Sequence, residues 1–70
     1  MQSTIKIIVN GESRTVDSQL TLRDLVEQLG LGSAAVAAEV NKQVIPRRDH
    51  DSTAIASGDR IELVTLVGGG

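Results

Sequence analysis

The sequence predicts an α+β domain in which one main helix packs on one face of a small β-sheet. Two observations indicate this fold class. Apolar and polar residues alternate near both ends of the chain, and one stretch between them repeats with helical spacing. The chain has 70 residues, which suits one domain. Because one helix can cover only one face of the sheet, we expect the other face to be open to water or to a partner.

The N-terminal segment predicts a β-hairpin. Ile5, Ile7 and Val9 occupy alternate positions, as in a half-buried strand. Asn10-Gly11 follows, and this dipeptide suits the positive φ angles of a type I′ turn. We expect residues 14–16 to return as the partner strand.

A short helix is predicted next. Its apolar stripe at positions i, i+3, i+4 and i+7 consists of Leu22, Leu25, Val26 and Leu29. Thr21 and Asp24 have the spacing of a capping box at its start. Gly30 suits the left-handed residue that ends a helix.

The segment after the helix is ambiguous. Its alanines favour a helix, whereas the alternation of Val36, Ala38 and Val40 favours a strand. We interpret it as the first of two strands joined by a turn at Asn41-Lys42. Pro46 then lies at a sheet edge, because proline cannot donate to a central ladder.

The C-terminal part predicts a polar connection and a last strand. Residues 47–57 are polar and irregular, with one helical turn expected over residues 53–56, and Gly58-Asp59 marks a turn. One face of the last strand is expected to carry Ile61, Leu63, Thr65 and Val67. The other face is expected to carry Arg60, Glu62, Val64 and Leu66.

Composition argues against several classes of protein. The 7 basic and 9 acidic residues are mixed along the chain, and there is no aromatic residue on which a base could stack. The N-terminus lacks the features of a signal peptide, and no stretch approaches the roughly 20 apolar residues that span a bilayer. We therefore expect a cytoplasmic protein that binds neither nucleic acid nor a membrane.

No catalytic constellation is evident. The single histidine, His50, lies between Asp49 and Asp51, and we interpret it as a solvated loop residue. A metal site formed by these three is a weak alternative, because adjacent residues rarely converge on one ion. We expect a chain that is not itself an enzyme and that holds neither metal nor cofactor.

Chemistry is instead predicted at the C-terminus. We expect a domain over residues 1–67 and a flexible glycine tail, Gly68, Gly69 and Gly70, which could enter a narrow channel of another protein. The terminal carboxylate is inert until it is activated, for example by adenylation, and it could then accept sulfur as a thiocarboxylate. A frayed tail without function is the alternative.

A docking surface is also predicted beside the tail. Val64 and Leu66 point outward on the last strand, and Ile8 points outward on the first. If these strands are neighbours, the three side chains form an exposed apolar patch. The alternative is ordinary scattered surface hydrophobes.

Four segments together resemble the ThiS family of sulfur carriers in thiamin biosynthesis. They are VNGE at 9–12, TLRDLVEQLGL at 21–31, VAAEVNKQVIPR at 36–47 and GDRIELVTLVGGG at 58–70. The combination of VN-x-x-VIPR, GD-x-IEL and a terminal diglycine is specific, whereas each piece alone is weak. The resemblance covers essentially the whole chain.

The resemblance implies a ubiquitin-like β-grasp fold with a mixed sheet, in which the last strand is central and parallel to the first. It implies that an adenylating enzyme of the ubiquitin-activating type uses ATP to activate Gly70. Sulfur from a cysteine desulfurase system then gives a thiocarboxylate, which thiazole synthase consumes. Gly69 and Gly70 match the family diglycine, and Gly68 is interpreted as a spacer.

Three alternatives remain open at this point. The small subunit of molybdopterin synthase shares the fold and the tail, although its relatives tend to be longer and to contain aromatic residues. A ubiquitin-like modifier would be joined through Gly70 to lysines of target proteins. A β-grasp binding module of the regulatory, RNA-associated kind is disfavoured by the lack of basic and aromatic surface.

Overall fold

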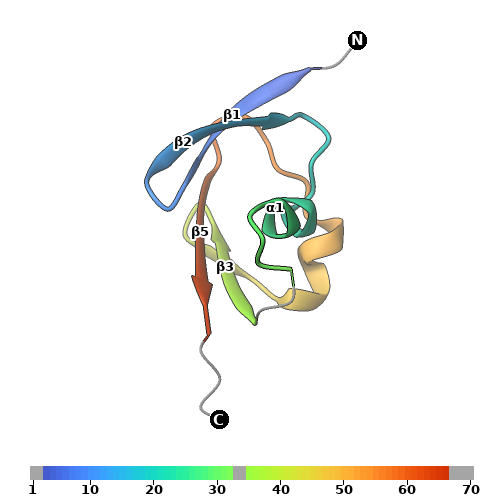
Figure 1. The fold of residues 1–70 in the computed structure, drawn as a ribbon, viewed down its shortest axis with the longest axis vertical. Coiled ribbons are helices and arrows are strands. Elements are labelled where there is room, and N and C mark those ends of the chain that lie inside the picture. The colour runs from blue at the N-terminus through green and yellow to red at the C-terminus, as the bar shows by residue number, and fades with distance from the viewer. Residues whose placement is uncertain (1–2, 33–34, 67–70) are drawn as a thin grey trace.

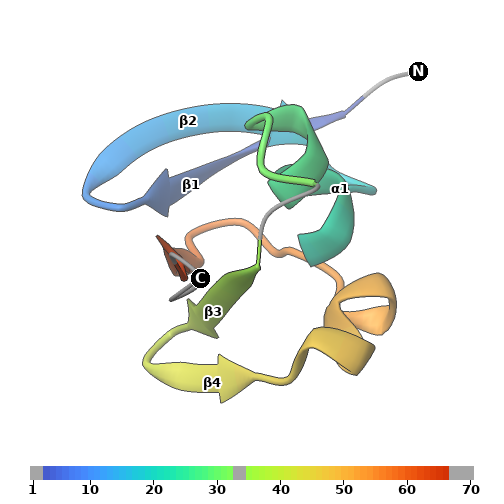
Figure 2. The same cartoon turned by 60° about the horizontal axis from the view of Figure 1, so that its bottom comes forward.

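The computed structural model describes residues 3–32 and 35–66. It contains a five-stranded mixed sheet in the order β2-β1-β5-β3-β4, with α1 and a 3₁₀ helix, η1, on the same side of it (Figure 1). The elements are β1 Thr4–Val9, β2 Glu12–Asp17, α1 Leu22–Gln28, β3 Val36–Val40, β4 Gln43–Ile45, η1 Arg47–Ser52 and β5 Arg60–Thr65. Figure 2 shows the β1–β2 hairpin and the β3–β4 hairpin on opposite sides of β5.

The last strand forms the middle of the sheet. It pairs in parallel with β1, through Ile8 with Arg60 and Val9 with Ile61. It pairs antiparallel with β3 over a longer stretch that ends with Val36 opposite Thr65. The central, parallel last strand of the β-grasp expectation is therefore confirmed.

Both hairpins contain tight turns with positive φ angles. Asn10 and Gly11 have φ angles of 50° and 84°, which confirms the predicted type I′ turn. Asn41 and Lys42 have φ angles of 53° and 69°, so the second hairpin turns in the same way. The ambiguous segment before this turn forms β3, as interpreted from its alternation.

Helix α1 begins and ends as its sequence predicts. The Thr21 Oγ1 atom accepts a hydrogen bond from the Asp24 backbone at 3.1 Å, and Asp24 Oδ2 accepts one from the Thr21 backbone at 3.1 Å. At the other end, Gly30 has a φ angle of 77°, and the Leu31 N–H donates to the Val26 carbonyl at 3.0 Å. These contacts satisfy backbone groups that a helix end leaves unpaired.

The core lies between α1 and the inner face of the sheet and consists of aliphatic side chains. Its most deeply buried large members are Ile7, Leu22, Leu25 and Ile61. On β5, Ile61 and Leu63 are buried while Glu62 and Val64 are exposed, which is the alternation expected of this strand. The opposite face of the sheet has no helix over it within residues 3–32 and 35–66.

The helical turn expected over residues 53–56 is wrong. The helix in this region is η1, which lies earlier, at Arg47–Ser52. Thr53 is extended because its carbonyl accepts from the Leu22 N–H at 2.8 Å, while the Ile55 N–H donates to the Leu20 carbonyl at 3.1 Å. Pairing with the chain just before α1 therefore uses the backbone groups that a helical turn would need.

Across the residues that the structure describes, no helix has the length and apolar character to cross a membrane. Within the same residues, no cluster of three or more histidine, cysteine or acidic side chains could hold a metal ion.

Candidate functional site

The candidate site is the end of β5, from which the predicted tail continues. Gly68, Gly69 and Gly70 lie outside the described residues, so the site is built from the residues that precede them. β3 supports β5 up to its end, since Thr65 lies opposite Val36 and the Leu66 N–H donates to the Ala35 carbonyl at 2.8 Å.

The other side of β5 is supported by the side chain of Asn10. The ladder between β1 and β5 ends at Val9 and Ile61. Beyond it, the Leu63 N–H donates to Asn10 Oδ1 at 2.9 Å, and Asn10 Nδ2 donates to the Leu63 carbonyl at 3.2 Å. One side-chain amide thus replaces the next peptide group of the ladder.

Asn41 makes a comparable pair of contacts near the start of β5. Its Oδ1 atom accepts from the Arg60 N–H at 3.0 Å, and its Nδ2 atom donates to Asp59 Oδ1 at 3.0 Å. The sequence pattern indicates only turns at Asn10 and Asn41 and does not predict these contacts. The dipeptide signals revealed the turns, but a contact across 53 positions, as from Asn10 to Leu63, leaves no local signal.

An apolar surface lies on the open face beside the end of β5. Val64 and Leu66 are 58% and 56% exposed. Val64 lies opposite the exposed Ala37 of β3, and Leu66 lies next to the exposed Ala35. We call these four residues the exit patch.

The exit patch borders an acidic row. Glu39 of β3 lies opposite Glu62 of β5, and both belong to the open face because their neighbours Ala38 and Ile61 are buried. Like charges placed opposite each other are unfavourable in a sheet. A partner with basic side chains at this border would relieve that repulsion.

Ile8 does not belong to the exit patch, which corrects the predicted three-residue surface. Ile8 is only partly exposed and lies opposite Arg60, four positions before Val64 on β5. At about 3.3 Å per residue, this corresponds to roughly 13 Å along the strand. Parallel pairing of the end of β1 with the start of β5 causes the separation.

His50 is buried, and its interpretation as a solvated loop residue is wrong. Its side chain lies in η1 and is the buried polar residue of the described core, with 7% of its surface exposed. Nε2 lies 3.0 Å from the Ile45 carbonyl oxygen, to which it donates. A 3₁₀ helix has three residues per turn, so His50 can face inward while its acidic neighbours face elsewhere.

A β-grasp sheet with a central last strand and one covering helix defines the structural class. The ThiS family model matches residues 7–70. A crystal structure of the thiamine biosynthesis protein ThiS from Geobacter metallireducens superimposes with a TM-score of 0.79 and 33% identity, covering 94% of this chain and 100% of that one. The chain therefore belongs to the ThiS family, as its motifs predicted.

Two relatives extend the comparison. The sulfur carrier protein ThiS of Escherichia coli is 29% identical over 66 residues, which are 94% of this chain and 100% of that protein. A thiazole synthase of Paramagnetospirillum magneticum is 35% identical over 66 residues, again 94% of this chain. The matched part is only 20% of that longer protein, so a domain similar to this chain forms one part of it.

Proposed function

We propose that the chain is a sulfur carrier of thiamin biosynthesis and that its reactive group is the Gly70 carboxylate. The observation that carries the proposal is the extent of the family match, which runs through residue 70 and so includes the glycine tail. The E. coli relative named as a sulfur carrier matches over its full length and supports the same role.

The proposed chemistry is performed on the chain by other proteins. An adenylating enzyme of the ubiquitin-activating type joins a carboxylate oxygen of Gly70 to the α-phosphate of ATP and releases pyrophosphate. Persulfide sulfur from a cysteine desulfurase system then attacks the acyl carbon, and AMP leaves. A thiol cleaves the resulting acyl disulfide, which releases the thiocarboxylate and leaves the thiol in a disulfide with the sulfur of the persulfide carrier. The resulting thiocarboxylate donates its sulfur to thiazole synthase. Gly68 and Gly69 would supply a tail without side chains for narrow partner sites.

The exit patch is proposed as the surface that docks the adenylating enzyme. Apolar side chains next to the tail would anchor the complex while leaving Gly70 free to reach the enzyme's active site. Glu39 and Glu62 predict basic residues at the matching border of that enzyme. For the second partner, the support is the occurrence of a similar domain within the P. magneticum thiazole synthase.

The test is an intact mass of the protein isolated from its native cells, with fragmentation to locate any change. We expect a gain equal to the replacement of one oxygen by sulfur, confined to Gly70. A variant that lacks Gly70 is the control and should show no gain. An unmodified terminus in thiamin-starved cells that retain the adenylating enzyme would contradict the proposal.

Proteins bound to the chain in the same preparation distinguish a thiamin carrier from a molybdopterin carrier and from a protein modifier. Co-purification with thiazole synthase supports the thiamin pathway, whereas co-purification with the large subunit of molybdopterin synthase would move the carrier to that pathway. A ladder of covalent adducts through Gly70 would instead indicate a protein modifier.

A further inference from the structure

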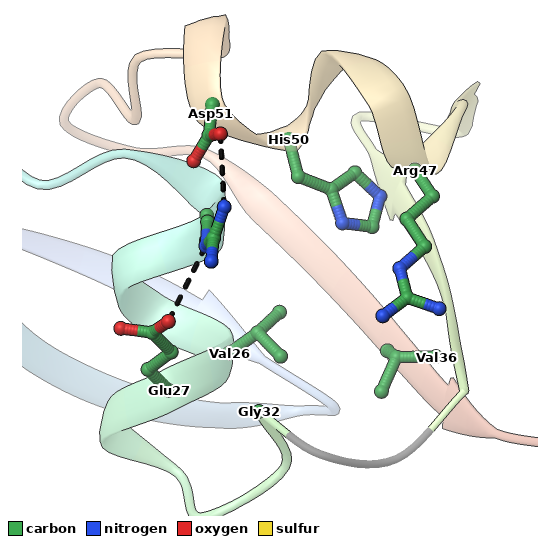
Figure 3. A pocket seen from close by; sticks show the side chains of 8 residues that line it. Val26, Glu27, Gly32, Val36, Arg47, His50 and Asp51 are labelled. Carbon is green, nitrogen blue, oxygen red and sulfur yellow. Dashed lines mark hydrogen bonds and ion pairs between the residues drawn. The ribbon is translucent and has the colours of Figure 1, made fainter.

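A small pocket lies on the helix-covered side of the sheet, on the face opposite the exit patch. It has a volume of about 140 Å³ and is bounded by α1, η1, the start of β3 and Gly32. Val26 of α1 and Val36 of β3 give it apolar walls (Figure 3). The buried His50 lines this pocket. The proposed carrier cycle gives the pocket no role.

The acidic side chains of the pocket are already paired. Arg23 Nε lies 3.3 Å from Glu27 Oε2, and Arg23 Nη1 lies 3.0 Å from Asp51 Oδ2. Hydrogen bonds to Glu27 and then to Asp51 raise the pKa of Arg23 above its ordinary value, so the guanidinium stays charged. One guanidinium shared by two carboxylates leaves this side of the pocket with a net charge of −1.

The opposite side of the pocket is basic. Arg47 and His50 are three residues apart in η1 and therefore lie on one face of this 3₁₀ helix. Figure 3 shows the Arg47 guanidinium reaching beside the His50 ring toward Val36. Among the described residues, Arg47 forms no ion pair, in contrast to Arg23.

The hydrogen bond of His50 determines what its second nitrogen can do. Nε2 donates to the Ile45 carbonyl, so in the neutral ring the proton is on Nε2 and Nδ1 is an acceptor. No described residue bonds to Nδ1, and no buried side-chain nitrogen or oxygen in this part of the chain lacks a partner. Nδ1 is therefore accessible from the pocket.

We propose that this pocket binds a carboxylate carried on a small apolar group, with the Arg47 guanidinium holding the two oxygens beside the His50 ring. The planar guanidinium matches the geometry of a carboxylate. Val26 and Val36 would contact the apolar part, and the volume limits the ligand to a few heavy atoms. A dianionic phosphate fits less well, because Glu27 and Asp51 form the facing wall.

The experiment is a titration of the full-length chain with isobutyrate, followed by NMR of the His50 ring and of the Val36 and Arg47 amides. Saturable shifts are expected at these positions. Arg47→Ala should weaken binding by about tenfold or more, the loss typical of a charge-assisted hydrogen bond. Arg48→Ala is the matched control, since Arg48 is exposed and does not line the pocket, and it should bind normally.

Two results would overturn the proposal. They are equal affinity of the Arg47→Ala and Arg48→Ala variants, and equal binding of the uncharged isobutyramide. A chain with an amidated C-terminus distinguishes two sources of the carboxylate. Tighter isobutyrate binding by that chain, with altered His50 signals, identifies the chain's own terminus as a competing ligand. Identical behaviour identifies a separate small molecule.

Discussion

Replacing Asn10 by glycine tests how much the side-chain amide of Asn10 stabilises the end of β5. Glycine tolerates the positive φ angle of 50° at this position, so the type I′ turn should survive. What is lost is the pair of hydrogen bonds to Leu63, at 2.9 and 3.2 Å. At about 0.5–1.5 kcal/mol for each bond, the variant should lose roughly 2 kcal/mol of unfolding free energy.

Thermal unfolding followed by far-UV circular dichroism measures this loss. Fluorescence is unsuitable because the chain has no aromatic residue. A loss of about 2 kcal/mol corresponds to a fall in Tm of roughly 8–16 °C for a domain of this size. Hydrogen exchange at the Leu63 amide measures the local stability of β5, and the protection factor of this amide should fall by about 30-fold.

The matched control is Lys42→Gly in the other hairpin. Lys42 also occupies a type I′ turn, with a φ angle of 69°, and glycine accepts this conformation more readily. The control should be neutral or stabilising. If Asn10→Gly leaves Leu63 protection unchanged, or if both variants lose the same stability, the side-chain amide does not support β5 and the reasoning is refuted.

Three further variants test the exit patch, the core and the end of the helix. Leu66→Glu should raise the KM for adenylation by about tenfold, the cost of one interface anchor, without unfolding the chain. Gln19→Glu adds the same charge at an exposed position between β2 and α1 and should not change the KM, so equal kinetics for the two variants would exclude docking through the exit patch. Leu25→Ala, at a site with 1% exposure, should cost about 2–5 kcal/mol in denaturant unfolding, and a cost below about 1 kcal/mol would contradict its place in the core. Gly30→Ala should cost about 1 kcal/mol because its φ angle is 77°, and unchanged stability would contradict the left-handed helix end.

The parts of the fold that sequence predicted well depend on neighbours in the chain. The Asn10-Gly11 turn and the capping box of Thr21 and Asp24 are local chemistry, and both formed as expected. The alternation of Ile61 and Leu63 likewise identified the buried face of β5. Family motifs added the strand order, which local patterns alone do not specify.

The errors concern features that depend on tertiary contacts. His50 looked solvated between two aspartates, but η1 turns its ring inward to the Ile45 carbonyl. Ile8 was grouped with Val64 because both point outward, while the register that separates them exists only once β1 and β5 pair. The alanines of the exit patch were missed for the same reason, since small side chains carry no signal until a partner strand places them.

Because β5 is central, the sheet can form only after this last strand has been synthesised. β1 and β3 do not pair with each other, so before β5 emerges the β1–β2 and β3–β4 hairpins have no shared ladder. Translation delivers β5 after all the other elements, and the sheet can close only then. A product truncated before Arg60 would leave two separate hairpins and an exposed core, which proteases readily degrade. Closure of the sheet therefore requires that its last strand has been made.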